Sequence, residues 1–355
     1  MLRSEPNRKQ AFYDTRQSLS VQSDVAAASE EAALLKVALP HAAWQSACGK
    51  AIIVGEHAVV YGARAVAMPL PNVRISVALQ PQHDFRADLG RRDGQAGVAV
   101  RVTLDGKTVS KQIYGVVTDA LQALEIEACP MHIEGHSSLP IGAGLGSSAA
   151  LCVALLRVLA DAYDKTVSLG ELAQLANQME TRFHGKPSGL DTAVVAYERI
   201  ISYARGQAPQ PVSIRNQGEA SWRFALLDSG VRSSTLATIQ QASPYFTGRH
   251  ADGRIARFDE LAGMVLSGFE KNQRGLVAEA MNEAARLLDA AGVVNDDLRR
   301  IEGDALRLGV AAAKPTGAGG GGAVLALLRD EDAEGQIARL QGLMGRENVY
   351  EVTLL

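Results

Sequence analysis

The sequence predicts an α+β fold, built either as two domains or as one large domain. Its 355 residues exceed the usual domain length of about 100–200 residues. Strand patterns dominate the first third, whereas several helical patterns run from about 234 to 308. A polar segment with Gly, Gln and Pro at 206–220 lies between these regions, so we expect a domain boundary near 215–222.

Residues 1–35 form an extension before the first strand. Their mixed charges and polar composition predict a disordered or weakly helical segment. Strands are predicted from short apolar runs or from alternation of apolar and polar residues. The predicted strands are 51–54, 73–79, 98–104, 131–136, 200–203, 224–227, 323–328 and 348–354. The Asp105-Gly106 dipeptide predicts a hairpin turn after the third of them.

Helices are predicted where apolar residues recur at helical spacing. Outside the 234–308 region, the predicted helices are 111–125, 149–162, 169–184 and 332–344. Gly185 is the expected stop signal of the third of these helices. The Lys-Pro-Ser-Gly-Leu-Asp segment at 186–191 predicts a loop.

Composition and charge exclude several classes of protein. Hydrophobic residues make up 47% and charged residues 21%, so a large core can be buried and the chain is not disordered throughout. A net charge of -3 gives no support for binding nucleic acid or an anionic membrane surface. We find no apolar run of the ~18 residues that a membrane helix needs. Cys48, Cys129 and Cys152 are far apart, which disfavours disulfides or a zinc site and favours a reducing cytoplasm.

A glycine-rich loop at 139–148 runs directly into the helix pattern at 149–162. Glycines let successive backbone N–H groups approach an anion, and a helix N-terminus adds about half a positive charge. Ser147 and Ser148 are residue types that cap helices, and we expect them to do so here. The G-x-G-x-G spacing is neither a dinucleotide fingerprint nor a Walker loop. It favours a phosphate site, and the alternative is a turn that only lets the helix pack.

A second glycine run, 317–322, follows Thr316 and precedes a predicted strand. Glycine inside a regular element costs roughly 1 kcal/mol per residue, so the run predicts a close approach of the backbone to another group. The alternative is a flexible loop. Two glycine-rich loops in one chain favour a shared polyanionic ligand.

Charged residues surround the end of the 51–54 strand, with Lys50 before it and Glu56 and His57 after it. Charged residues at a buried strand end are unusual unless they are paired or functional. The alternative is a surface lysine with a capping glutamate.

Two carboxylates, Glu180 and Asp191, flank the loop at 186–191. A carboxylate at a helix end and one in a loop can meet at one site, where one holds a metal and the other accepts a proton. His184 is four residues after Glu180, but no third nitrogen or sulfur ligand is evident. We therefore expect His184 to pack or form a hydrogen bond near the helix end.

Three segments together resemble the signature motifs of the GHMP kinases. They are Gly55-Glu56-His57, the Pro140–Ser148 loop and the Lys314–Gly322 segment. The resemblance covers about residues 43–355. Within this superfamily, the sequences at 55–62 and 187–191 most resemble the mevalonate kinase family.

The resemblance implies the two-domain GHMP kinase fold. Its N-terminal domain, expected over 36–220, resembles the second domain of ribosomal protein S5, and its C-terminal domain, expected over 221–355, is ferredoxin-like. The implied activity is ATP-dependent phosphorylation of (R)-mevalonate to 5-phosphomevalonate in isoprenoid biosynthesis. The resemblance also implies Mg²⁺ as cofactor, a cytoplasmic enzyme without membrane or nucleic-acid partners, and allows a homodimer.

The resemblance assigns roles to individual residues. Asp191 matches the catalytic aspartate and Lys50 its lysine partner, Ser148 and Glu180 match the magnesium ligands, and Glu56 and His57 match positions near bound mevalonate. The residues implied to bind ATP are Pro140, Gly142, Ala143, Gly144, Leu145, Gly146, Ser147, Ser148, Thr235, Gly317 and Gly319.

This sequence departs from the family pattern at three positions. Cys48 and Ile141 stand where proline is usual, which softens the local turn geometry. Lys186 replaces an asparagine and adds positive charge beside the expected acceptor site. That charge keeps phosphomevalonate kinase, or another small-alcohol kinase of the superfamily, open as an alternative. A nucleotide-binding sensor without activity is a further alternative, but it has no need for Lys50 and Asp191 together.

Overall fold

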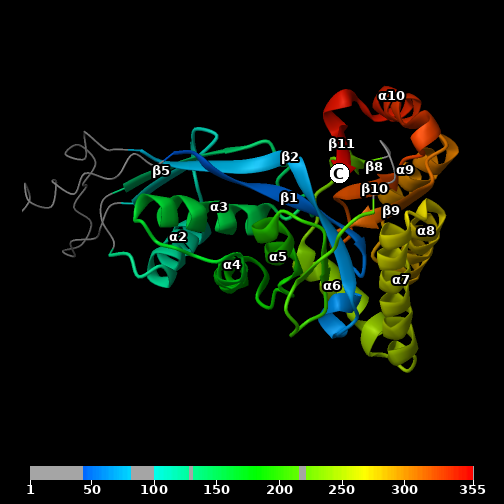
Figure 1. Cartoon of the computed structure of the whole chain (residues 1–355), viewed down its shortest axis with the longest axis horizontal. Helices are drawn as coiled ribbons and strands as arrows, with labels where there is room; N and C mark the ends of the chain where they lie inside the picture. The colour runs from blue at the N-terminus through cyan, green and yellow to red at the C-terminus, as the bar shows by residue number, and fades with distance from the viewer. Residues whose placement is uncertain (1–42, 81–99, 128–130, 216–220, 355) are drawn as a thin grey trace, which may run out of the picture. The chain divides into compact units, whose positions relative to one another are not determined.

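The computed structural model describes residues 43–80, 100–127, 131–215 and 221–354, which form two β-sheets and the helices that pack on them (Figure 1). The first sheet has the order β4-β3-β5-β2-β6-β7, and β1 pairs with β2. Its strands are β1 (Gln45–Val54), β2 (Ala65–Gln80), β3 (Val100–Leu104), β4 (Lys107–Thr108), β5 (Met131–Ser137), β6 (Ile201–Tyr203) and β7 (Gln210–Pro211). The β3–β5 pair is parallel, and the other pairings in the described part of this sheet are antiparallel.

The long strand β2 is the centre of this sheet. Its second half contains the predicted strand 73–79, whereas its first half, from Ala65 to Leu70, is buried on both faces and shows no alternation. The turn between β3 and β4 confirms the predicted hairpin, because Asp105 and Gly106 both have positive φ values, 50° and 72°.

Helix α3 (Ser147–Ala162) contacts β1 and β2 on one side and α2, α4 and α5 on the other, which explains why it is apolar almost all round. In Figure 1 it runs along these two strands. The surrounding helices are α2 (Lys111–Ala123), α4 (Leu169–His184) and α5 (Leu190–Tyr197). Ser168 and Glu171 form a capping box at the start of α4. The predicted helices in this region are confirmed.

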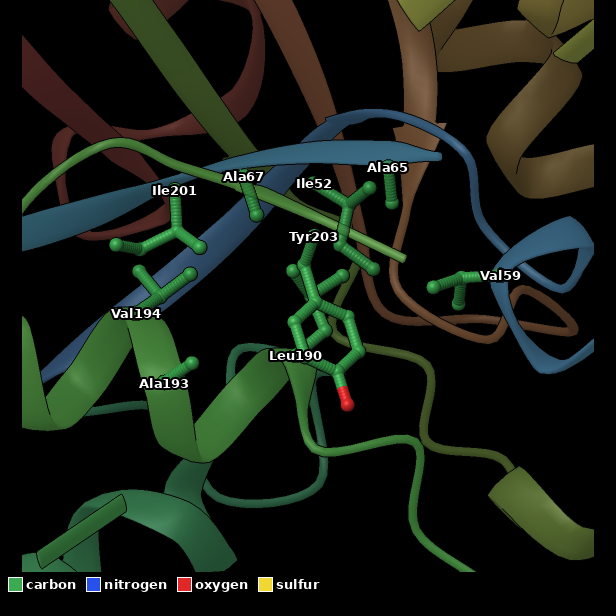
Figure 2. Close-up of a cluster of buried hydrophobic side chains, with 9 residues drawn as sticks. All are labelled: Ile52, Val59, Ala65, Ala67, Leu190, Ala193, Val194, Ile201 and Tyr203. Atoms are coloured by element: carbon green, nitrogen blue, oxygen red, sulfur yellow. The ribbon is translucent and has the colours of Figure 1, made fainter. Parts of the chain in front are cut away.

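Helix α5 is a difference from the prediction, because the expected loop ends at Gly189 and a helix begins at Leu190. Figure 2 shows the reason: α5 side chains face apolar residues of the sheet. This cluster consists of Ile52, Val59, Ala65, Ala67, Leu190, Ala193, Val194, Ile201 and Tyr203. Tyr203 also donates a hydrogen bond from its hydroxyl to the Ser188 carbonyl oxygen (2.8 Å), which ties the preceding loop to the same cluster.

The second sheet is antiparallel and has the order β11-β8-β10-β9. Its strands are β8 (Trp222–Asp228), β9 (Ala312–Thr316), β10 (Ala323–Leu327) and β11 (Val349–Leu354). Strand β9 was not predicted, because it is buried on both faces and its sequence therefore lacks alternation. Pro315 is tolerated in β9 because this strand lies at the edge of the sheet.

Helices accompany the second sheet and confirm the helical patterns of this region. They are α6 (Thr235–Thr247), α7 (Ala251–Lys271), α8 (Arg274–Ala290), α9 (Asp296–Arg307) and α10 (Ala333–Met344). Short 3₁₀ helices occur at η1 (Ala58–Tyr61), η3 (Asp330–Asp332) and η4 (Arg346–Asn348). Within the described ranges, no helix combines the length and apolar character that crossing a membrane requires. The predicted extension at 1–35 and part of the predicted domain boundary, at 216–220, lie outside the described residues.

Candidate active site

The loop between β5 and α3 is shaped by three glycines at alternate positions. Gly142, Gly144 and Gly146 have φ values of 77°, 75° and 77°, a left-handed conformation that favours glycine. Gly146 is the N-cap of α3, and among the described residues no side chain forms a capping hydrogen bond at this helix start. The expectation that Ser147 and Ser148 cap α3 is therefore wrong, because both lie inside its first turn. The resulting helix N-terminus suits an anion.

The loop at 138–146 is called the phosphate loop, after the role that the sequence predicts for it. Lys50, in β1, contacts this loop through both its backbone and its side chain. Its backbone N–H donates to the Leu145 carbonyl oxygen (2.9 Å), and its Nζ donates to the Gly144 carbonyl oxygen (3.1 Å). A Cβ at Gly146 would lie 2.8 Å from Lys50 Cγ, so the loop glycine also makes room for the lysine stem.

The glycine run 317–322 packs directly against the phosphate loop. A Cβ at Gly317 would lie 2.7 Å from the Gly144 carbonyl oxygen, and one at Gly322 would lie 2.6 Å from the Ala143 carbonyl oxygen. Both distances are shorter than real Cβ contacts. The close approach predicted from the sequence is thus made, and its partner is the backbone of the phosphate loop.

The same lysine contacts the first turn of α5. Lys50 Nζ lies 3.1 Å from Asp191 Oδ2, and the Asp191 side chain is 32% exposed whereas Lys50 is buried. The cluster of Figure 2 holds Leu190 and hence the start of α5 in place. One buried ammonium therefore joins the phosphate loop to a partly accessible carboxylate.

A second carboxylate, Glu180, lies in the last part of α4 and is buried. The Ser148 hydroxyl donates to Glu180 Oε1 (2.6 Å), and His184 Nε2 lies 3.1 Å from the same hydroxyl oxygen. Burial, followed by the nearby Asp191 charge, raises the pKa of Glu180 to about 7. His184 forms a hydrogen bond near the helix end, as expected from the sequence.

The oxygen atoms of Ser148 and Glu180 are suited to a magnesium ion. Mg²⁺ prefers hard oxygen ligands and usually keeps several waters while one or two carboxylates and substrate phosphates hold it. A cation would also relieve the repulsion between Glu180 and Asp191 that contributes to the raised Glu180 pKa. In the described ranges, no group of three or more His, Cys, Asp or Glu residues forms a protein-only metal site.

Glu56 and His57 contact the third motif of the sequence. Glu56 Oε1 accepts a hydrogen bond from Lys314 Nζ in a fully buried ion pair. His57 Nε2 lies 2.8 Å from the Ala318 carbonyl oxygen, and its ring stacks on Phe246 of α6. Burial lowers the pKa of His57, so the imidazole is neutral at pH 7.

The segment after β8, together with the first turn of α6, contributes contacts that the sequence did not predict. Thr235 is the first residue of α6, but the hydroxyls that bind the glycine run are those of Ser233 and Thr238. They donate to the Gly319 carbonyl oxygen over 2.8 and 3.4 Å. A run of hydroxyl residues after a strand was the available signal, but it does not say which one points inward.

Arg232 and Asp228 were also missed. Arg232 forms a two-pronged ion pair with the buried Asp228 carboxylate (2.7 and 2.8 Å), and its Nε donates to the Ile141 carbonyl oxygen (3.0 Å). The side chain also packs beside Gly142. A charged residue at the end of the buried strand β8 was the signal that pointed to this pair.

Comparisons with known proteins agree with this geometry. The family model for the GHMP kinases N terminal domain matches residues 111–199, and the model for the GHMP kinases C terminal domain matches residues 265–341. A mevalonate kinase of Archaeoglobus fulgidus is 30% identical over 292 residues, which is 82% of this chain and 94% of that protein. The chain belongs to the GHMP kinases and, among them, to the mevalonate kinase family.

Solved structures confirm the predicted GHMP kinase fold. The structure of L. major mevalonate kinase in complex with R-mevalonate has a TM-score of 0.72 and 19% identity, over 90% of this chain and 97% of that one. Streptococcus pneumoniae phosphomevalonate kinase, in complex with phosphomevalonate and AMPPNP, has a TM-score of 0.70 and 16% identity, over 88% of this chain and 100% of that one. At these identities the likeness concerns the fold alone.

Proposed function

We propose that this kinase transfers the γ-phosphoryl group of ATP to the primary hydroxyl of (R)-mevalonate, giving ADP and 5-phosphomevalonate. The observation that carries the proposal is the position of Lys50 Nζ, which contacts both Asp191 and the carbonyl of Gly144 in the phosphate loop. Through this contact, a carboxylate that we propose as the proton acceptor lies next to the loop that we propose binds the phosphates, in a member of the mevalonate kinase family.

Asp191 acts as the general base in this proposal. A base must come within hydrogen-bond reach of the proton that it removes, and Asp191 is more accessible than the buried Glu180 and Glu56. It accepts the hydroxyl proton while the hydroxyl oxygen bonds to the γ-phosphorus and the bond to the ADP oxygen breaks. Lys50 holds the carboxylate in position and stabilises negative charge that develops on the acceptor oxygen.

The phosphate loop and the first turn of α3 bind the ATP phosphates through backbone N–H groups. Phosphoryl transfer asks the protein mainly for positioning and charge neutralisation. Pro140, Gly142–Ser148, Gly317 and Gly319 remain the proposed ATP contacts of the two glycine-rich segments, and Thr235 remains one from α6. The packing of Gly317 on Gly144 suggests that the second segment acts chiefly by shaping the first.

Ser148 and Glu180 are the proposed magnesium ligands. When bound, Mg²⁺ neutralises charge on the β- and γ-phosphate oxygens. The Ser148 hydroxyl already lies 2.6 Å from Glu180 Oε1, so both side chains present oxygen at one place without a change of fold. His184 orients the serine hydroxyl from its other side.

Glu56 and His57 are the proposed contacts to mevalonate. His57 Nε2 faces a carbonyl oxygen, which can only accept a hydrogen bond, so Nε2 carries the proton and Nδ1 has a lone pair. His57 can therefore accept a hydrogen bond from a hydroxyl group of the acceptor.

Phosphomevalonate is the second candidate acceptor. Lys186 is exposed in the loop before α5, where its charge could attract a phosphate group. An ADP-release assay with mevalonate, phosphomevalonate, galactose and homoserine side by side tests both candidates. We expect mevalonate to have the highest kcat/KM. A higher value for phosphomevalonate, lost in Lys186→Asn, would replace the first proposal by the second.

We further propose a cytoplasmic homodimer. Cys48 and Cys152 are free thiols, which fits a reducing compartment. The dimer rests on the family resemblance, and light scattering coupled to size-exclusion chromatography tests it.

A further inference from the structure

Lys314, in strand β9, has a fully buried ammonium group whose three hydrogen-bond donors all have acceptors. Its Nζ donates to Glu56 Oε1, to the Ile52 carbonyl oxygen (3.2 Å) and to the Pro315 carbonyl oxygen (2.6 Å). An ammonium has three donors, so none is left to bind a ligand. Burying a charge is unfavourable unless it is paired and hydrogen-bonded, and here both conditions hold.

The contacts of Lys314 belong to a continuous attachment between two distant segments. Thr316, two residues along β9, accepts from the Ile52 N–H (2.8 Å) and donates to the Ile52 carbonyl oxygen (3.2 Å). Two residues further along the chain, the Ala318 carbonyl oxygen forms a hydrogen bond with His57 Nε2. Three alternate residues, in β9 and just after it, therefore hold the segment from Ile52 to His57.

This attachment holds a turn in a conformation that needs support. His57 has a φ of 57°, which is unfavourable for a residue with a side chain, and it follows Gly55, whose φ is 103°. Such conformations persist where the surroundings fix them. Glu56 lies between these two residues, and its carboxylate is fixed by Lys314.

The electrostatic surroundings make Glu56 depend on this lysine. Its second oxygen, Oε2, is buried and has no hydrogen-bond partner among the described residues. Burial raises the pKa of Glu56 and lowers that of Lys314, while the charge of each opposes the shift of the other. The negative charge of Glu302 in α9 also raises the pKa of Lys314, and the positive charge of Lys50 lowers it.

We infer that Lys314 is a positioning residue for the acceptor side of the active site, which it serves by fixing Glu56 and, through the turn, His57. Its own contacts are to Ile52, Glu56 and Pro315 and not to the phosphate loop. Its loss should therefore affect the acceptor much more than ATP. This inference rests on the proposed function in naming mevalonate as the acceptor.

The test compares Lys314→Met with a double variant in which no buried charge is left unpaired. Lys314→Met keeps the length of the side chain but leaves Glu56 buried without its cation, which can impair folding. The double variant Lys314→Met/Glu56→Gln has neither charge, and Glu56→Gln alone keeps the lysine with an amide acceptor. Arg157→Met is the matched control, because Arg157 is a partly buried cation that pairs with Glu198 outside the site.

Three quantities are measured for each variant: the ATP dissociation constant, kcat/KM for mevalonate, and the NMR signals of the His57 ring without substrate. For Lys314→Met we expect a loss in kcat/KM on the order of 10²-fold, typical of a displaced substrate contact. The kcat/KM of the double variant should be about tenfold lower than that of Glu56→Gln alone, which is the effect of losing one charge-assisted hydrogen bond. The ATP dissociation constant should change by less than about threefold, because Lys314 does not contact the phosphate loop.

The outcomes separate positioning from mere stability. A shift of the His57 signals with intact ATP affinity supports the inference, whereas equal kcat/KM for the double variant and Glu56→Gln overturns it. Parallel losses for ATP and mevalonate, as in a generally destabilised protein, also overturn it. If the wild type does not phosphorylate mevalonate, the proposed function fails, and the His57 signals decide the inference about Lys314 on their own.

Discussion

Lys50 Nζ lies at equal distance, 3.1 Å, from Asp191 Oδ2 and from the carbonyl oxygen of Gly144. The same ammonium group thus fixes both the proposed base and the loop that we propose receives the phosphates. Their relative position is set by one side chain, which is buried and cannot easily change its conformation.

Asp191→Asn should lower kcat by about 10²–10⁴-fold, the usual contribution of a general base. The amide keeps the shape of the side chain but cannot accept the hydroxyl proton. The ATP dissociation constant should change little, because the phosphate loop is intact. Asp164→Asn, in the exposed turn after α3, is the control. Near-normal turnover in Asp191→Asn would remove this residue from the proton transfer.

Lys50→Met should lower kcat and also weaken ATP binding, because Nζ contacts the phosphate loop as well as Asp191. When Lys50→Met and Asp191→Asn are combined, the loss in kcat should be smaller than the product of the separate losses, as for residues that act as a unit. Single-turnover kinetics on the double-mutant cycle measure this coupling. Strictly multiplicative losses would show that the two residues act independently.

Glu180→Gln should raise the Mg²⁺ concentration needed for half-maximal activity, and Ser148→Ala should raise it less. The glutamate provides charge that attracts the cation, whereas the serine provides one neutral oxygen. The measurement is a Mg²⁺ titration of activity at fixed ATP, with Glu270→Gln on the exposed surface of α7 as control. Full activity of Glu180→Gln at low Mg²⁺ would contradict the ligand assignment.

Arg232→Met should raise the KM for ATP by about tenfold and leave the KM for mevalonate unchanged. The arginine holds the Ile141 carbonyl oxygen and packs beside Gly142, so its loss frees the start of the phosphate loop. Because Asp228 would then be buried without its cation, the comparison includes Arg232→Met/Asp228→Asn. Arg232→Lys should recover only part of the affinity, because lysine lacks the planar fork. Equal effects on both substrates would point to general unfolding.

Glu198→Gln should lower the midpoint of thermal unfolding at pH 7, and the difference from the wild type should shrink as the pH falls below about 4.5. Burial alone would raise the pKa of Glu198, but hydrogen bonds from Arg74 and Arg157 outweigh burial and lower it. A carboxylate with a lowered pKa in the folded state stabilises the protein above its unfolded pKa, and this stabilisation is lost on protonation. Calorimetric scans from pH 3 to pH 8 test this. A constant difference would show that the ion pairs are not responsible.

The sequence predicted the elements that have one buried face. Alternation marked the second half of β2, and helical spacing marked α2 and α4, because one-sided burial leaves a period in the sequence. Strand β9 and helix α5 are buried nearly all round, so their sequences show no period. The positions of β9 and α5 therefore depend on packing against residues that are distant in the sequence.

The motif resemblance brought the main site residues into one hypothesis, but it did not give their partners. Lysine is almost never fully buried without a partner, and the burial of Lys314 follows only from the position of Glu56. Likewise, serine is a residue type that often caps helices, but Gly146 occupies the N-cap position of α3. The Ser148 hydroxyl instead donates a hydrogen bond to Glu180. These pairings depend on tertiary contacts.

The packing of the 317–322 glycines on the phosphate loop has a consequence for how the protein matures. A ribosome finishes the phosphate loop long before it adds the glycines at 317–322, so the emerging chain carries this loop without the packing that shapes it. When the whole chain refolds, loop-closure entropy must be paid before contacts this distant in sequence can form, so we expect them to form slowly. Acquisition of nucleotide affinity should therefore report the completion of folding and not the formation of the first sheet.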